Sequence, residues 1–216
     1  MKVMLYDTGV GLLPFLKSII KKEKYNEYYL YMDEDVFPIG KKDEVFIINH
    51  LKFILNYASK RFDQIVIACN TISSYLKCID TGKYNIEILS IFEDNIKLLD
   101  NNTTFLATKG TLRNVKHQYV IDGSILPSLI ENNQIKEIIE FINNLDFKTE
   151  KIILGCTHFP LIKFIFEDFH KNKTFISGED ELVEKIPNSG FISIDGNKKA
   201  KKYLATYLNF CNKILC

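Results

Sequence analysis

Two cysteines stand in closely matched settings in the two halves of this sequence. Cys156 follows the apolar residues 152–155 and precedes a threonine and a histidine, whereas Cys69 follows the apolar residues 65–68 and precedes an asparagine and a threonine. An apolar, β-favouring run that stops at a small residue predicts a buried strand whose carboxyl end delivers the side chains that follow. The sequence therefore presents two thiols in the same way, from two halves of one chain.

Two thiols on opposite sides of one carbon atom can invert that carbon. One thiolate removes a proton from one face, and the other thiol returns a proton to the opposite face. An ordinary cysteine, with a pKa of about 8.5, is mostly protonated near neutrality and needs a partner before it can act as a base. Asp7 beside one cysteine and His158 beside the other could supply that help. The expected reaction is a two-base racemisation or epimerisation.

The α-proton of an amino acid is only weakly acidic, so the carbanion needs hydrogen-bond donors around it. Side chains that can donate follow the expected strands at Thr8, Asn70, Thr71 and Thr157. No aldehyde-binding lysine, phosphate cradle or metal cluster stands out, so the sequence favours a reaction without a cofactor. Zinc binding by the two cysteines and the histidine is disfavoured, because the paired short spacings of zinc sites are missing.

The elements that must position these residues alternate along the chain. Strands are expected at residues 2–6, 27–32, 64–68, 86–91, 104–107, 151–154, 175–177 and 191–194. Helices are expected at residues 14–22, 43–62, 73–78, 93–99, 124–132, 134–145, 161–168 and 198–210. This alternation predicts an α/β fold with mainly parallel sheets and ligands at the carboxyl ends of the strands.

The two cysteines are separated by close to half of the 216 residues, which favours two pseudo-symmetric α/β lobes with the active site in the cleft between them. We expect residues 1–91 and 191–216 to form the first lobe and residues 92–190 the second. A single buried cysteine after a strand is more often a packing residue, and Asp7 could simply cap the next helix. The matched pair of cysteines is what favours chemistry.

Composition restricts the partners. The chain is 46% hydrophobic and 25% charged with a net charge of +1, which is typical of a globular protein and gives no field for nucleic acid or an anionic membrane. Asp7 interrupts the apolar start, and no apolar run approaches the roughly 20 residues of a membrane span, so a cytoplasmic location is expected. Cys78, Cys211 and Cys216 are expected in packing or at the surface, as are three histidines at positions 50, 117 and 170.

Five motifs resemble, in the same order, those of glutamate racemases, over about residues 2–181. They lie at residues 7–11, 37–40, 68–71, 107–111 and 154–160. The resemblance implies cofactor-independent racemisation of glutamate by two cysteines, supplying D-glutamate for bacterial peptidoglycan and hence for cell wall biogenesis and cell shape. It implies a small-molecule amino acid as the partner and leaves a homodimer open.

The resemblance also implies roles for individual residues. Cys69 and Cys156 would be the two bases, with Asp7 and His158 as their assistants. Glu131 resembles a second acidic helper near the histidine. The residues that resemble substrate-binding positions are Thr8, Ile39, Gly40, Asn70, Thr71, Thr111 and Thr157.

Three positions depart from the family pattern. Thr8 stands where a serine is usual, Leu12 replaces a glycine, and Ile39 replaces a tyrosine before Gly40. Two alternatives therefore stay open, a racemase for aspartate or another acidic amino acid, and a non-catalytic relative that binds a carboxylate. The acidic start of the first motif, at Asp7, favours the glutamate branch over the aspartate branch.

Overall fold

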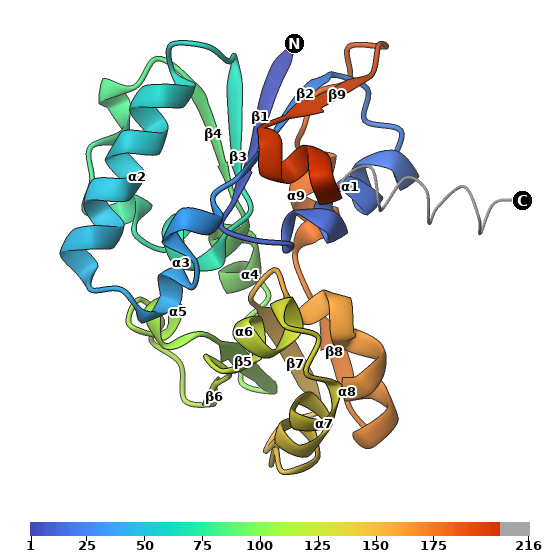
Figure 1. Ribbon diagram of the computed structural model, residues 1–216. Helices are drawn as coiled ribbons and strands as arrows, with labels where there is room; N and C mark the ends of the chain where they lie inside the picture. Colours follow the sequence, from blue (N-terminus) through green and yellow to red (C-terminus); the bar gives the residue numbers. More distant parts are fainter. Residues whose placement is uncertain (204–216) are drawn as a thin grey trace, which may run out of the picture.

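Two parallel sheets form the framework of the molecule, and the computed structural model describes residues 1–203 (Figure 1). The first sheet has the strand order β4 (Glu87–Ser90), β3 (Gln64–Ile67), β1 (Lys2–Asp7), β2 (Glu27–Met32) and β9 (Ser193–Gly196). The second has the order β6 (Val120–Asp122), β5 (Thr103–Ala107), β7 (Lys151–Gly155) and β8 (Thr174–Ile176). Every neighbouring pair of strands runs parallel, which confirms the predicted α/β fold.

Helices connect these strands and cover the sheets. Around the first sheet lie α1 (Leu12–Lys21), α2 (Glu44–Ala58), α3 (Asn70–Ser73), α4 (Ile91–Lys97) and α9 (Glu179–Glu184). Around the second lie α5 (Lys109–Leu112), α6 (Leu126–Glu131), α7 (Ile135–Asn143) and α8 (Lys163–Phe169). Short 3₁₀ helices occur at Glu34–Val36, Ile39–Lys41, Leu76–Cys78, Thr81–Lys83 and Phe159–Ile162.

The central strand β1 explains how the first sheet is held. Its side chains alternate between two cores, with Val3 and Leu5 packed against α1 on one face and Met4 and Tyr6 against α2 on the other. All four are fully buried, as expected for a parallel strand covered on both faces. This burial fixes the register of the strand and leaves Asp7 at its carboxyl end.

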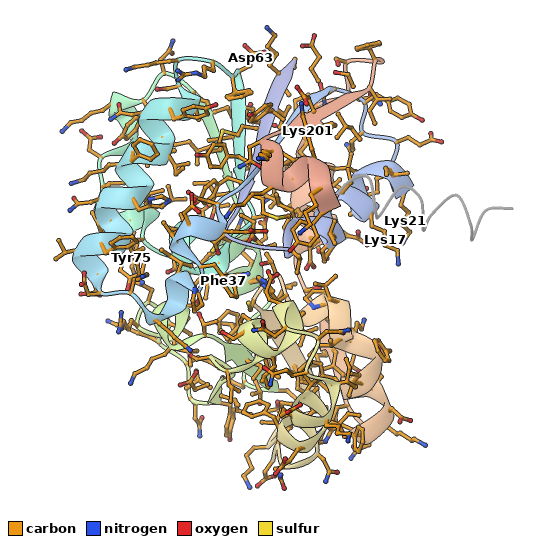
Figure 2. The ribbon with its side chains drawn as sticks, viewed as in Figure 1. Lys17, Lys21, Phe37, Asp63, Tyr75 and Lys201 are labelled. Carbon is orange, nitrogen blue, oxygen red and sulfur yellow. The ribbon has the colours of Figure 1, made fainter. Side chains whose placement is uncertain are left out.

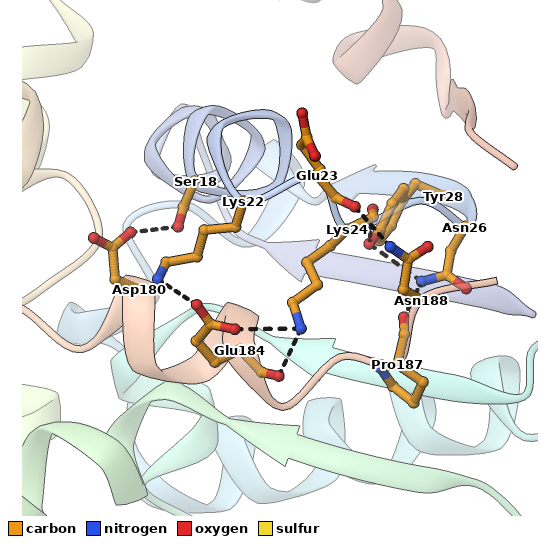
Figure 3. Close-up of polar contacts among 10 residues, drawn as sticks. All are labelled: Ser18, Lys22, Glu23, Lys24, Asn26, Tyr28, Asp180, Glu184, Pro187 and Asn188. Atoms are coloured by element: carbon orange, nitrogen blue, oxygen red, sulfur yellow. Dashed lines mark hydrogen bonds and ion pairs between the residues drawn. The ribbon is translucent and has the colours of Figure 1, made fainter. Parts of the chain in front are cut away.

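Helix α9 and the segment after it are attached to the first lobe (Figure 3). Leu182 and Val183 lie in the core that contains α1. Ser18 on α1 donates a hydrogen bond to Asp180, and Lys22 pairs with Glu184, as Figure 3 shows. We therefore propose that the first lobe resumes before α9, earlier than residue 191, because this segment buries its apolar side chains against α1.

Several elements differ from those expected. The short strand β6 and helix α9 were not expected, and the last described strand begins at Ser193 rather than at residue 191. The helix after Cys69 begins immediately at Asn70, three residues earlier than predicted. The long helix α2 ends at Ala58, four residues before the expected end at Phe62.

The chain end and the minor cysteines complete the description. Residues 198–203 are helical, and Ala200 packs into the first core. The remainder of the expected helix up to Phe210, together with Cys211 and Cys216, lies outside the described residues. Cys78 is an exposed free thiol. Within residues 1–203, no helix is both long enough and apolar enough to cross a membrane.

The three histidines expected at the surface are all partly buried. His50 Nε2 lies 2.9 Å from the Tyr6 hydroxyl and 2.9 Å from Asp33 Oδ2. His117 and His170 each place Nε2 2.8 Å from a backbone carbonyl oxygen. The surface prediction was wrong because these rings find hydrogen-bond partners within the fold.

Candidate active site

Both cysteines line a single pocket at the carboxyl ends of the strands of the two sheets. The expected site residues that line it are Asp7, Thr8, Ile39, Gly40, Cys69, Asn70, Thr71, Cys156, Thr157 and His158. Two further expected residues, Glu131 and Thr111, do not line the pocket but bond to residues that do. The structure thus brings together thiols that lie far apart in the sequence.

Cys69 sits between the buried strand β3 and the first turn of α3. Its Sγ lies 3.9 Å from the Thr8 hydroxyl. Burial raises the pKa of the Cys69 thiol to about 12, and Asp7 acts in the same direction. Backbone N–H groups of Ile72 and Thr71 oppose that rise, because donors stabilise a thiolate. The thiol is therefore protonated near neutrality and would be a strong base once ionised.

Cys156 follows β7 in an equivalent position. Its Sγ lies 3.9 Å from His158 Nδ1. Burial raises the pKa of the Cys156 thiol well above its ordinary value, and Cys69 and Asp7 add to the rise. The two thiols thus have similar surroundings, since both are buried and both are affected by the charge of Asp7, and Cys156 has in addition the His158 ring beside it.

Asp7 is fully buried at the end of β1. Its Oδ1 accepts hydrogen bonds from the backbone N–H groups of Thr8 at 2.6 Å and Gly9 at 3.1 Å. Its Oδ2 makes no hydrogen bond of standard geometry among the described residues, although the nearby Thr157 side chain helps to lower the pKa of the carboxyl. Burial raises the pKa of the Asp7 carboxyl to about 6, against the opposing effect of His158. The carboxylate can therefore be ionised at neutral pH, and its Oδ2 can accept a proton.

His158 is held by Glu131 from behind the pocket. Glu131 Oε1 lies 2.8 Å from His158 Nε2 and also accepts a hydrogen bond of 2.8 Å from the backbone N–H of Val10. Burial opposes ionisation of Glu131, but these bonds outweigh it and hold the pKa of Glu131 below its usual value. A carboxylate only accepts, so His158 Nε2 carries the hydrogen, and in the neutral ring Nδ1 faces Cys156 as an acceptor.

Three threonine hydroxyls connect the two lobes beside the pocket. Thr71 lies 3.0 Å from Thr108 and 3.1 Å from Thr111, and the latter two are 3.2 Å apart. Thr111 is fully buried and supports Thr71 and Thr108 from behind. The sequence pointed to Thr111, whereas Thr108, in the same motif, is the one that lines the pocket.

Sequence reasoning also missed five other residues that line the pocket, which are Phe37, Pro38, Lys41, Ser124 and Pro127. Figure 2 shows Phe37 at the boundary between the two lobes, and its ring centroid lies 5.6 Å from that of His158. Phe37 and Pro38 belong to the motif at residues 37–40, so taking every residue of that motif as a candidate would have found them. Ser124 and Pro127 carry no such signal, because their approach depends on how α6 packs.

A buried carboxyl outside the pocket predicts how stability depends on pH. Burial raises the pKa of Glu179 to about 7, from an ordinary value of 4.5. The folded state binds this proton more tightly than the unfolded state, so the stabilisation is present below about pH 4 and is lost as pH rises through 7. Relative to the wild type, Glu179→Gln should be stabilised by about 3 kcal/mol more at pH 8 than at pH 4, measured by urea unfolding. If the difference in unfolding free energy between Glu179→Gln and the wild type did not change with pH, the raised pKa of Glu179 would be contradicted.

The described part of the chain contains no group of three or more His, Cys, Asp or Glu side chains placed to hold a metal ion. The polar side chains at the pocket are instead two thiols, a carboxylate, an imidazole, the ammonium of Lys41, the amide of Asn70 and several hydroxyls. Such a set can take a proton from one side of a small molecule and return a proton from the other.

Comparison with known proteins identifies relatives across nearly the whole chain. No protein-family model matches the sequence. Glutamate racemase of Buchnera aphidicola from Acyrthosiphon pisum (strain APS) is 31% identical, covering 95% of this chain and 89% of its own. The structure of glutamate racemase from Campylobacter jejuni matches with a TM-score of 0.80 at 23% identity, covering 95% and 96% of the two chains. The Francisella tularensis enzyme in complex with D-glutamate matches with a TM-score of 0.75 at 21% identity, covering 90% and 86%.

Proposed function

The chain belongs to the glutamate racemase family, and we propose that it interconverts L- and D-glutamate by two-base, cofactor-independent racemisation. The observation that carries this proposal is that Cys69 and Cys156 line one pocket, each beside a different titratable partner. A packing role would explain either cysteine alone. It would not explain why two elements so distant in sequence deliver thiols to the same small site.

In the proposed reaction, the first thiol gives its proton to its partner and becomes a thiolate. That thiolate removes the α-proton of glutamate while the second thiol protonates the opposite face of the carbon. The second thiolate then regains a proton from solvent, and the partner of the first thiol releases its proton to solvent, which returns both pairs to their starting state. Asp7 serves Cys69 in this scheme, and His158, held by Glu131, serves Cys156. The reverse reaction exchanges the two roles, which suits thiols in similar surroundings.

The remaining residues would hold the substrate. We assign donor roles to the side chains of Thr8, Asn70, Thr71 and Thr157, and a close backbone approach to Ile39 and Gly40. An added Cβ at Gly40 would lie 2.9 Å from the Thr108 hydroxyl, which explains the need for glycine in this loop. Thr111 would act indirectly, by fixing the hydroxyls of Thr71 and Thr108.

Lys41 offers a test of preference for an acidic substrate. It is the only lysine or arginine among the described residues that line the pocket, and its side chain is exposed. We propose that it attracts the side-chain carboxylate of glutamate. Lys41→Gln should raise KM about fivefold and leave kcat nearly unchanged, because an exposed ion pair contributes about 1 kcal/mol. Lys60→Gln, an exposed change away from the pocket, is the control, and an unchanged KM in Lys41→Gln would exclude this role.

The proposal as a whole is tested by incubating the protein with a panel of single L- and D-amino acids that includes glutamate and aspartate. Formation of the opposite enantiomer from glutamate, and more slowly from aspartate, supports it. Faster turnover of aspartate would indicate the alternative specificity, and no turnover of any acidic amino acid would indicate a binding protein.

The cellular setting is also a proposal. The family resemblance suggests that the enzyme acts in the cytoplasm, that its D-glutamate enters peptidoglycan, and that the chain can form a homodimer. Its partner is then a small amino acid, with no nucleic acid or membrane involved. Size measurement in solution tests the dimer.

A further inference from the structure

A chain of hydrogen bonds fixes the side-chain amide of Asn70 from outside the pocket. Asn70 Oδ1 accepts a hydrogen bond of 2.9 Å from Asn95 Nδ2. Asn95 Oδ1 in turn accepts one of 2.9 Å from the backbone N–H of Gly178. Asn95 lies on α4 with 1% of its surface exposed, and it does not line the pocket.

The backbone of Gly178 determines which way both amides point. An N–H group can only donate, so the oxygen of Asn95 must face Gly178 and its NH₂ group must face Asn70. The oxygen of Asn70 must then face Asn95. Among the described residues, no acceptor bonds to the NH₂ group of Asn70, and this residue lines the pocket. The NH₂ group is thus left as a donor for a ligand.

We propose that Asn95 is a positioning residue for the racemase reaction, which turns Asn70 so that its NH₂ group meets a carboxylate of the substrate. This inference rests on the proposed function, in which Asn70 binds substrate. With the amide reversed, the Asn70 oxygen would face the carboxylate and repel it. Asn95 thereby converts a residue that could accept or donate into one that only donates.

Gly178, which fixes the Asn95 amide, lies on the segment that crosses from the second lobe to the first. Gly178 lies between β8 of the second sheet and α9, which packs on the first lobe. An added Cβ at Gly178 would lie 3.1 Å from Asn95 Oδ1 and 3.3 Å from the Cβ of Asp94. The crossover between the lobes therefore contacts Asn95 closely and holds its amide in one orientation.

Asn95→Asp is the direct test, because it keeps the shape and the acceptor for Gly178 but removes the donor to Asn70. The Asn70 amide should then reverse, raising KM for glutamate about tenfold or more with a smaller change in kcat. In an Asn70→Ala background the same change should have little further effect on KM. Equal effects in both backgrounds would overturn the inference, because a purely structural role would not depend on Asn70.

Two further variants show whether an effect of Asn95→Asp comes from misfolding. Asn144→Asp is the matched control, since Asn144 is exposed and its amide donates only to the carbonyl oxygen of Glu140. Asn95→Ala removes the same donor without burying a charge, and it should show the same dependence on Asn70. If Asn95→Asp does not fold, the effects of Asn95→Ala in the wild-type and Asn70→Ala backgrounds decide the outcome instead.

A readout independent of activity separates this inference from the proposed function. In ¹⁵N-labelled protein, the side-chain NH₂ signals of Asn70 can be assigned by their loss in Asn70→Ala. They should shift in Asn95→Asp or Asn95→Ala and stay in place in Asn144→Asp. Unshifted signals would overturn the positioning role. If the signals shift but the wild-type protein turns over no amino acid, the orientation of Asn70 by Asn95 is supported and the racemase function is excluded.

Discussion

Replacing either Cys69 or Cys156 with alanine should reduce racemisation about 10³-fold, within the range expected for loss of one proton-transferring group. Each thiol serves a different face of the α-carbon in the proposed reaction, so the remaining one cannot complete an inversion. Polarimetry of purified variants with L-glutamate and with D-glutamate measures the loss. Cys78→Ala should keep wild-type activity, because Cys78 is exposed and does not line the pocket.

The same variants should differ in a way that loss of folding cannot imitate. With one thiol left, the enzyme can remove and return the α-proton of one enantiomer from one face only. Cys69→Ala and Cys156→Ala should therefore each exchange α-hydrogen with deuterium oxide for a single enantiomer, and for opposite ones. If either variant exchanged the α-hydrogen of both enantiomers, the assignment of one thiol to each face of the α-carbon would be contradicted.

Gly9→Ala should lower kcat/KM about 100-fold or more. A Cβ at this position would lie 2.3 Å from Glu131 Oε1 and 2.9 Å from His158 Nε2. The clash is with the end of a flexible glutamate, so the fold should survive while the carboxylate moves away from the histidine. Loss of that hydrogen bond leaves His158 without its fixed hydrogen on Nε2, which the proposed proton transfer from Cys156 requires.

Gly82→Ala provides the matched control for this change. Its nearest neighbour would be Asp80 Oδ1 at 3.4 Å, an ordinary contact in an exposed turn. Both variants should keep a cooperative thermal transition near that of the wild type, so that only activity separates them. A Gly9→Ala enzyme within twofold of wild-type kcat/KM would exclude the role given to Glu131.

Much of the framework followed from local patterns. The strands that end at Asp7 and before Cys69 contain the buried apolar runs 3–6 and 65–67, so their course could be predicted closely from the sequence pattern. Strand β6 could not, because it has three residues and none of them is buried. Helix α9 begins with three acidic residues, and its burial depends on α1, which lies far away in sequence.

The site was predictable to the extent that its residues fall in short motifs. The contact between Glu131 and His158 was anticipated only from the family resemblance, since nothing local to either residue pairs them. Asn95 has no sequence signal at all, because its effect depends on a contact with Gly178, which lies 83 residues later in the sequence. Residues that act through tertiary contacts of this kind become visible only when the chain is folded.

The two-base claim is tested most directly by following L-glutamate with the wild-type protein in deuterium oxide at early times. The thiol that protonates the product carries deuterium from solvent, whereas the proton taken from the substrate is removed by the other thiol. At low conversion, D-glutamate should therefore be deuterated at the α-carbon while the remaining L-glutamate keeps its hydrogen. Equal deuterium in both enantiomers, or no exchange in either, would contradict racemisation by two opposed thiols.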